Sequence, residues 1–303
     1  MNIKSEIKIM HKLSTLTFKL SCLFLAVFVF ASCKNSDLIQ RGDSLEVAFE
    51  KAMAFYEKED YSNASEAFET VVQIARGTEY GQDAQFYLAG SYYNDGRYLL
   101  AASEYERFIS LFPRVERRQE AQFKEAYSYY KLSPRYKLDQ KYTRMAIEKF
   151  QLYNSRFPNS DKADEAGKYI SEMRTKLAKK LYHSGDLYLR TDRYDAAIIY
   201  YDLTIDKYPE TKWAQRALVD EIKTYSIYAD RSVASKQRER YQKAVEAYEK
   251  FIQLFPNGEY RQEAEELVDE ARTALADLPE EAPVVEENEE NLQAEVDADS
   301  NTN

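Results

Sequence analysis

The sequence predicts an all-α fold, a solenoid of about five antiparallel helix pairs. Two observations predict it: one residue pattern recurs five times along the chain, and each copy has the apolar spacing of a helix. In the pattern, a Tyr is followed after three residues by Ala, and an aromatic residue stands four positions further on. An aromatic-Pro pair closes the pattern, eleven and twelve residues after the Ala. Such self-similarity at intervals of tens of residues indicates a repeat protein.

Three copies of the pattern are complete, at 98–113, 194–209 and 241–256. A fourth matches from Ala146 onward, and the first, which starts at Tyr61, lacks the Pro. The Ala and the aromatic residue four positions later share one face of a helix, so each copy predicts a helix whose small residue lets a neighbour approach closely. Since Pro cannot continue a helix, each helix should end at the aromatic-Pro pair.

A partner helix is expected upstream of each copy. In three copies a small residue lies twelve positions before the pattern Ala, namely Ala52, Ala89 and Gly185, and an aromatic residue follows three positions later. Paired helices of this kind are typical of tetratricopeptide repeats; an ordinary helical bundle with coincidental spacing is the alternative. The pattern Ala residues are 37, 45, 51 and 47 residues apart, more than the minimal repeat of about 34. Longer helices or inserted loops are therefore expected, with extra residues at 132–139 and 229–240.

The first 32 residues indicate an export signal. Four Lys accompany an apolar run over 20–31 that is too short to span a bilayer. The run ends in Ala31-Ser32-Cys33, which resembles the lipobox of bacterial lipoproteins, so Cys33 is the predicted site of lipidation by acyl chains such as palmitate. An ordinary secretory signal cut near Ala31 is the alternative. Lys34 follows the Cys without an acidic cluster, which favours the periplasmic face of the outer membrane.

Charge divides the remaining chain into three parts: a lipidated tether at 33–42, a tetratricopeptide-repeat domain at 43–278 and a disordered acidic tail at 279–303. The tail carries nine acidic residues and no basic one. The whole chain has a formal charge of −10; removing residues 1–32 makes it −13, and removing the tail as well leaves about −4. This nearly balanced body lacks the excess of positive charge expected of a nucleic-acid-binding protein.

Catalytic chemistry finds little support in the sequence. His183 is the single His after the signal segment, and no second His or Cys of the mature chain can complete a metal site with it. Neither a P-loop nor a G-x-G-x-x-G motif occurs among only eight Gly. We therefore expect no enzyme activity, no cofactor and no metal.

Aromatic residues are abundant in this chain, which contains 26 Tyr and 15 Phe. Most should form the core, but two Tyr-Tyr pairs place adjacent rings about 100° apart on a helix, so one ring of each pair faces elsewhere. Stacked repeats present their first helices on a concave surface. There we expect flat rings beside cations to bind an extended peptide with aromatic side chains and a terminal carboxylate. The candidates are Tyr93, Arg97, Lys124 and Tyr130.

With its lipobox, short tether and five irregular repeats, the chain resembles the BamD family of outer-membrane assembly lipoproteins. The resemblance covers about 43–275 and is most specific at 139–160, 177–178, 194–197 and 208–211. It implies a non-catalytic, periplasm-facing subunit of the β-barrel assembly machinery. In that family the N-terminal repeats bind unfolded outer-membrane proteins, and the C-terminal repeats dock the barrel subunit BamA, with which other assembly lipoproteins associate. Leu181, in place of the usual Glu, and the acidic tail depart from the family pattern.

The fifth repeat suggests a docking surface for the barrel subunit. Between its two predicted helices the chain has a local excess of basic residues, which we interpret either as a solvated loop or as a segment that meets acidic groups of the partner. These candidates are Arg231, Lys236, Arg238, Arg240 and Lys243.

Two other functions were considered. The first is a different periplasmic tetratricopeptide adaptor of the cell envelope, such as the coordinator that accompanies the Tol–Pal system. Those proteins usually carry three regular repeats behind a coiled-coil segment, and no heptad pattern precedes residue 43 here. The second is a glycan-handling lipoprotein, which would need a pair of carboxylates in a pocket.

Overall fold

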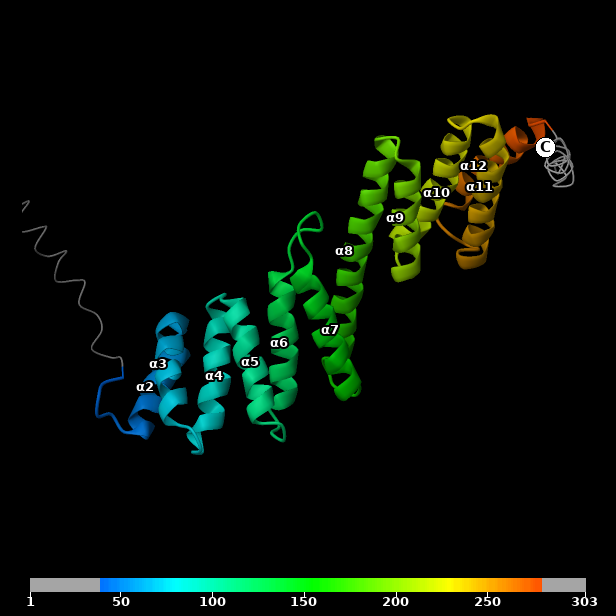
Figure 1. Cartoon of the computed structure of the whole chain (residues 1–303). Coiled ribbons are helices and arrows are strands. Elements are labelled where there is room, and N and C mark those ends of the chain that lie inside the picture. Colours follow the sequence, from blue (N-terminus) through cyan, green and yellow to red (C-terminus); the bar gives the residue numbers. More distant parts are fainter. Residues whose placement is uncertain (1–38, 280–303) are drawn as a thin grey trace, which may run out of the picture. The chain divides into compact units, whose positions relative to one another are not determined.

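The computed structural model describes residues 39–279, and the predicted signal peptide, Cys33 and the residues from 280 onward lie outside this range. Within it the chain forms eleven helices, α2 to α12, and no strand (Figure 1). The prediction of an all-α fold is confirmed. None of these eleven helices is long and apolar enough to cross a bilayer.

The helices alternate as first and second members of successive pairs. The first members are α2 (Leu45–Glu57), α4 (Tyr80–Asn94), α6 (Arg118–Leu132), α8 (Ala163–Arg190) and α10 (Lys212–Asp230). The second members are α3 (Tyr61–Ile74), α5 (Tyr98–Leu111), α7 (Lys141–Arg156), α9 (Tyr194–Lys207) and α11 (Ala234–Leu254). The helix α12 (Arg261–Asp277) follows the fifth pair and packs on α10 and α11. The described residues thus contain the expected five pairs and one additional terminal helix.

The chain divides into two compact units, and the boundary falls within α8, between Met173 and Arg174. Unit 1 contains α2 to α7 with the first part of α8, and its core is a cluster of Ala, Phe and Tyr side chains between residues 48 and 121. Unit 2 contains the rest of α8 with α9 to α12, and its main apolar cluster is built between residues 197 and 271.

Four second helices end at the aromatic-Pro pairs, as predicted. The residue before each Pro has left the helical region, with φ between −138° and −123° and ψ between 50° and 66°. Its backbone N–H still donates to the carbonyl four residues back, so the last turn remains closed. These terminating residues are Phe112, Phe157, Tyr208 and Phe255.

The pattern Ala residues are the points where paired helices meet. All five are fully buried, at 64, 101, 146, 197 and 244, and so is the aromatic residue four positions later in the first four copies. In the fifth copy Tyr248 is only partly buried, and the Arg272 guanidinium covers its ring at 5.5 Å. Gly185 permits the closest approach, since a Cβ there would lie 2.6 Å from Cε1 of Tyr201.

The long intervals between repeats have two different causes. Residues 133–140 form an irregular connection between α6 and α7, where the buried Gln140 amide donates to the carbonyls of Arg135 and Leu138, each at 2.9 Å. This insertion was predicted. The insertion predicted at 229–240 is wrong, because only residues 231–233 separate α10 from α11. Lengthened helices fill these later intervals instead: α8, α10 and α11 have 28, 19 and 21 residues.

Candidate peptide-binding groove

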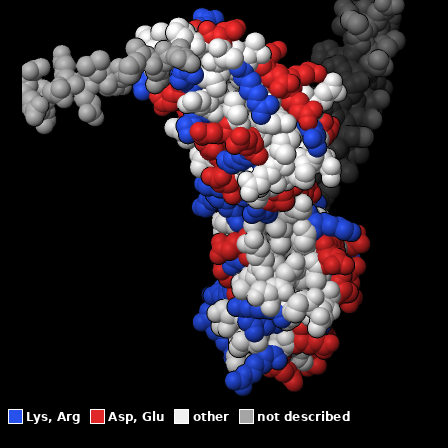
Figure 2. All heavy atoms as spheres, turned by 90° about the vertical axis from the view of Figure 1, so that its right-hand side faces the viewer, with Lys and Arg blue, Asp and Glu red and all other residues white. Residues whose placement is uncertain are grey.

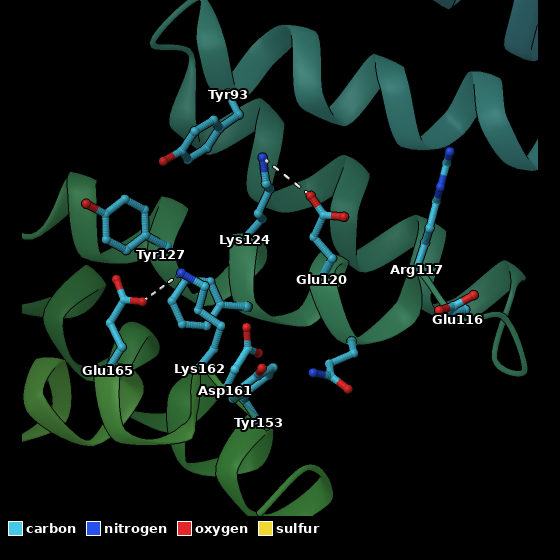
Figure 3. Close-up of a pocket in the computed structure, with 12 residues that line it drawn as sticks. Tyr93, Glu116, Arg117, Glu120, Lys124, Tyr127, Tyr153, Asp161, Lys162 and Glu165 are labelled. Atoms are coloured by element: carbon cyan, nitrogen blue, oxygen red, sulfur yellow. Dashed lines mark hydrogen bonds and ion pairs between the residues drawn. The ribbon is translucent and has the colours of Figure 1, made fainter. Parts of the chain in front are cut away.

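A cavity of about 810 Å³ opens in unit 1 beside the first helices of successive pairs (Figure 3). Most of its lining comes from residues 116–127, which belong to α6 and the two residues before it. Tyr93 near the end of α4, Tyr153 of α7 and residues 161–165 at the start of α8 complete it. First helices line the concave surface of such repeat stacks. The cavity, hereafter the groove, therefore lies on the surface where the sequence predicted a binding site.

One side of the groove is an aromatic wall made of Tyr93, Phe123, Tyr127, Tyr130 and Tyr169. Tyr127 is its centre: its ring centroid lies 6.2 Å from that of Tyr93, 5.4 Å from Tyr130 and 5.2 Å from Tyr169. Phe123 stacks on Tyr127 with an interplanar angle of 10°. The spacing of 123, 127 and 130 places three of the rings on one face of α6. Ring faces of this kind suit stacking with aromatic side chains of a ligand.

Cations stand at the rim of this wall. The Lys124 ammonium lies 5.1 Å from the centroid of the Tyr93 ring and 3.7 Å from the Glu120 carboxylate (Figure 3). The Lys162 ammonium lies 5.4 Å from the Phe123 centroid and 2.9 Å from Glu165. Their hydrogen bond raises the pKa of Lys162 and lowers the pKa of the Glu165 carboxyl. The carboxylates of both pairs, Glu120 and Glu165, are 54% and 39% exposed, so exchanging such a carboxylate for that of a ligand costs little.

Three tyrosines of the wall, Tyr93, Tyr130 and Tyr169, have hydroxyls that burial or a hydrogen bond influences. Burial raises the pKa of Tyr93 to about 12. Burial and a hydrogen bond to Glu172, at 2.9 Å, raise the pKa of Tyr130 to about 12 as well. The Tyr169 hydroxyl donates to Glu165 at 3.0 Å. The hydroxyls of Tyr93 and Tyr130 therefore keep their protons at physiological pH, and those of Tyr130 and Tyr169 position the carboxylates of Glu172 and Glu165.

Two of the four predicted peptide-binding residues, Tyr93 and Lys124, line the groove. Tyr130 does not line it but extends the aromatic wall through its contact with Tyr127. Arg97 does not line it either. Gly96, with a φ of +77°, turns the chain at the end of α4, and the Arg97 guanidinium stacks on the Tyr92 ring at 4.5 Å. The Arg97 guanidinium also forms an ion pair with the Asp95 carboxylate at 2.6 Å, so its charge is neutralised within the turn.

Sequence reasoning missed ten of the twelve residues that line the groove, among them Phe123 and Tyr127 of the aromatic wall and the ion pair of Lys162 with Glu165. These four show why. The first two had a signal, since together with Tyr130 they repeat at helical spacing along α6. The other two had none, because they come from the start of α8, beyond α7 in the chain, and reach the groove only through tertiary packing.

The five basic residues predicted to dock the barrel subunit lie in unit 2, but not in a loop as expected. Arg231 lies in the short connection, whereas the other four belong to the first half of α11. Lys236 and Lys243 form exposed ion pairs with Glu239 and Glu246, at 3.0 and 2.7 Å. The segment is helical because α11 is anchored by Tyr241 and Ala244, which are buried about two and three turns after the helix begins.

The two remaining arginines of this segment have partners within unit 2. The guanidinium of Arg240 lies 3.4 Å from the centroid of the Tyr228 ring and donates to the Ser232 hydroxyl. Nη2 of Arg238 donates to the carbonyl oxygens of Leu278, at 3.3 Å, and Pro279, at 2.9 Å. Both side chains are half-buried. Their removal would consequently alter packing as well as charge.

His183, the single His of the predicted mature chain, packs beside the only Trp of the protein. Its ring centroid lies 5.3 Å from that of Trp213 and 5.2 Å from Tyr182. Residues 39–279 contain no group of three or more His, Cys, Asp or Glu side chains that could hold a metal ion. On the face drawn in Figure 2, acidic and basic side chains are intermingled and form no extended field of one sign.

Comparison with protein families identifies two relationships. The model of the YfiO family, described as an outer membrane lipoprotein, matches residues 42–241, and a tetratricopeptide repeat model matches residues 232–258. A comparison with curated protein sequences gives no significant match.

Three similar solved structures share at most 17% of their residues with this chain. A tetratricopeptide repeat protein from Bacteroides fragilis has 14% identity and a TM-score of 0.44, with 76% of this chain and 99% of that chain covered. The TPR2AB domain of yeast Sti1 in complex with an HSP90 peptide has 17% identity and a TM-score of 0.35, with 84% and 96% covered. A tetratricopeptide protein from Thermus thermophilus has 13% identity and a TM-score of 0.30, with 77% and 100% covered. At such scores these similarities carry nothing about function.

The family match covers about two thirds of the 303 residues and includes the groove. It agrees with the recurring pattern, the paired helices and the aromatic-Pro ends that the structure displays. The chain therefore belongs to the YfiO family of outer membrane lipoproteins, which is the family of BamD, and it is built of tetratricopeptide repeats.

Proposed function

We propose that this chain is a non-catalytic subunit of the β-barrel assembly machinery, anchored in the outer membrane through acylated Cys33 and facing the periplasm. Its groove in unit 1 holds an extended segment of an unfolded outer-membrane protein, and unit 2 docks the barrel subunit BamA. The family supports the setting. The observation that carries the proposed activity is the aromatic wall with Lys124 and Lys162 at its rim.

The groove can recognise such a segment without reading a unique sequence. Alternate side chains of an extended strand point to the same side, so two aromatic residues of one strand face can contact Phe123 and Tyr127 together. Each aromatic contact contributes about 0.5–1.5 kcal/mol beyond its buried area. Lys124, with a side chain only 30% exposed, is placed to bind a carboxylate of the segment in place of Glu120. The ring contacts of Phe123 and Tyr127 tolerate different sequences, and Lys124 adds one charged contact. This combination suits an adaptor that binds many unfolded substrates.

A binding experiment tests the groove. The probe is a fluorescent peptide with alternating aromatic residues and a free C-terminal carboxylate. Tyr127→Leu should weaken its binding about tenfold, because roughly 1.4 kcal/mol of ring stacking is lost. Tyr142→Leu is the matched control, since Tyr142 is a partly exposed tyrosine of unit 1 that does not line the groove. Equal affinities for wild type and Tyr127→Leu would rule out the groove as the binding site.

The anchor is tested with the same peptide carrying an amidated C-terminus. If Lys124 binds the carboxylate, amidation should weaken binding to wild type, and Lys124→Gln should weaken binding of the free acid but not of the amide. An equal effect of Lys124→Gln on both peptides would show that the ammonium contributes only packing. This double comparison separates charge recognition from the aromatic contact.

Docking of the barrel subunit is proposed for three exposed basic residues of the fifth helix pair, Arg231, Lys236 and Lys243. Charge reversal by Lys236→Glu with Lys243→Glu should slow association with the periplasmic part of BamA, most strongly at low salt. The melting temperature should hardly change, because both side chains are about half exposed and form only surface pairs. Purification from detergent-solubilised membranes gives the wider test. Co-elution of Tol–Pal components in place of the barrel subunit would favour the alternative adaptor function.

A further inference from the structure

Residues 231–243, hereafter the basic segment, are a local reversal of charge in an acidic chain. They contain five basic residues and a single acidic one, Glu239, whereas the whole chain has a formal charge of −10. Arg231, Lys236 and Lys243 are exposed. The N-cap residue of α11, Val233, is 70% exposed and offers no capping side chain to the first turn of the helix. The amide groups of that turn favour negative charge nearby.

The described part of the chain ends directly against this segment. The helix α12 stops at Asp277, and Arg238 of the basic segment donates to the carbonyls of Leu278 and Pro279. Residues 280–303 therefore start from a point that is fixed beside α11. Both hydrogen bonds of Arg238 go to backbone carbonyls, so they do not depend on which side chains follow Pro279.

The sequence beyond Pro279 is complementary to the basic segment. The 24 residues from 280 to 303 contain nine acidic side chains and no basic one, and four of the acids are concentrated at 286–290. The acidic cluster begins seven residues after Pro279, and a stretch of that length reaches about 15 Å even without being fully extended. The α11 part of the basic segment, residues 234–243, is about 14 Å long at 1.5 Å per residue. The acidic cluster therefore reaches every exposed cation of the segment.

We propose that the acidic tail, residues 280–303, occupies the basic segment of its own chain when no partner is bound. A short tether gives the tail an effective concentration near the millimolar range, so even a weak electrostatic contact is substantially populated. On the proposed function, in which BamA docks on the same residues, the tail is an internal competitor. A partner then binds only when its own acidic surface displaces the tail. A protein with little negative charge cannot do so and is excluded from the basic segment.

Photo-crosslinking in the full-length protein, purified from membranes in detergent, tests this proposal. A photoreactive amino acid in place of Asn288 reports the neighbours of the acidic cluster, and the adducts are mapped by mass spectrometry. The expected adducts lie on residues 231–243 of the same chain. They should fall several-fold at about 1 M salt, where the Debye length shrinks to about 3 Å.

Two matched variants establish the role of charge. Lys236→Gln with Lys243→Gln should reduce these adducts several-fold, whereas Lys212→Gln with Lys223→Gln, which removes two exposed Lys of α10, should leave them unchanged. Adducts on other parts of the chain, on a second copy or on a co-purified protein would overturn the proposal, as would adducts that ignore salt. Because this experiment needs no BamA, its failure is distinct from a failure of the charge-reversal test of docking.

Discussion

Gly185→Ala tests the closest approach between two helices of unit 2. The added Cβ would lie 2.6 Å from Cε1 and 2.8 Å from Cδ1 of Tyr201, and 3.2 Å from the carbonyl oxygen of Ala197. Carbon atoms in good contact are about 3.5–4.0 Å apart, so the ring or the helix must move by about 1 Å. Tyr201 and Ala197 are both fully buried, so neither can move simply by swinging out into solvent.

Two opposing terms set the expected size of the effect. Replacing Gly by Ala within a helix gains about 1 kcal/mol of helix propensity. Overpacking a well-packed core costs about 1–3 kcal/mol. Gly167→Ala, on the same helix α8, isolates the first term, because a Cβ there meets nothing within 4 Å. Gly167→Ala should therefore stabilise the protein, and Gly185→Ala should be less stable than it by about 1–3 kcal/mol.

Urea denaturation followed by helical circular dichroism measures the free energy of unfolding of both variants. The slope of each transition must be compared first, since a changed slope would indicate a change in the cooperative unit rather than in stability. If Gly185→Ala is as stabilising as Gly167→Ala, α8 and α9 do not pack as closely as described. The argument from close approach would then be refuted.

Three further predictions concern other parts of the chain. Ala101→Leu should lower stability by about 1–3 kcal/mol because Ala101 is fully buried, while Ser103→Leu on the exposed face of α5 should not; equal melts would mean that the repeat register is wrong. Burial raises the pKa of Glu221 to about 8, above its ordinary value of 4.5. Stability should accordingly fall as pH rises through this interval, and Glu221→Gln should flatten the urea midpoints between about pH 5 and pH 8; an unchanged pH profile contradicts this. Cys33→Ser should lose its acyl label and leave the membrane fraction, and a variant that still sediments with label after a salt wash would disprove the anchor.

The predictable part of the fold is the part that is fixed locally. The residue before Pro113 must leave the helical region, so the end of α5 is determined within two residues of sequence. The spacing of Ala101 and Tyr105 determines which face of α5 is buried in the same way. Both facts are independent of what the helix packs against. The end at Pro recurs in four of the five repeats, and a fully buried aromatic residue four positions after the Ala occurs in the first four.

The rest depended on partners that are distant in the sequence. The start of α11 carries few apolar residues, so nothing marked it as a helix, yet Arg240 packs on the Tyr228 ring of α10 and Arg238 on the chain after α12. Arg97 was assigned to the groove from its position near Tyr93, and the turn at Gly96 directs it elsewhere. A quarter of the groove lining, Asp161, Lys162 and Glu165, lies at or just before α8, and only tertiary packing brings these residues beside α6.

The position of the single Trp gives this protein a built-in spectroscopic label. Trp213 belongs to unit 2, where its ring contacts those of Tyr182 and His183, whereas unit 1 contains tyrosine and no Trp. Selective excitation of the indole therefore follows the unfolding of unit 2 alone, while far-ultraviolet dichroism follows the helices of both units. Coincident curves would identify one cooperative block, and separated curves would measure how much of the stability each unit holds by itself. The chain can thus report, without any attached dye, whether repeats that share the helix α8 also share one unfolding transition.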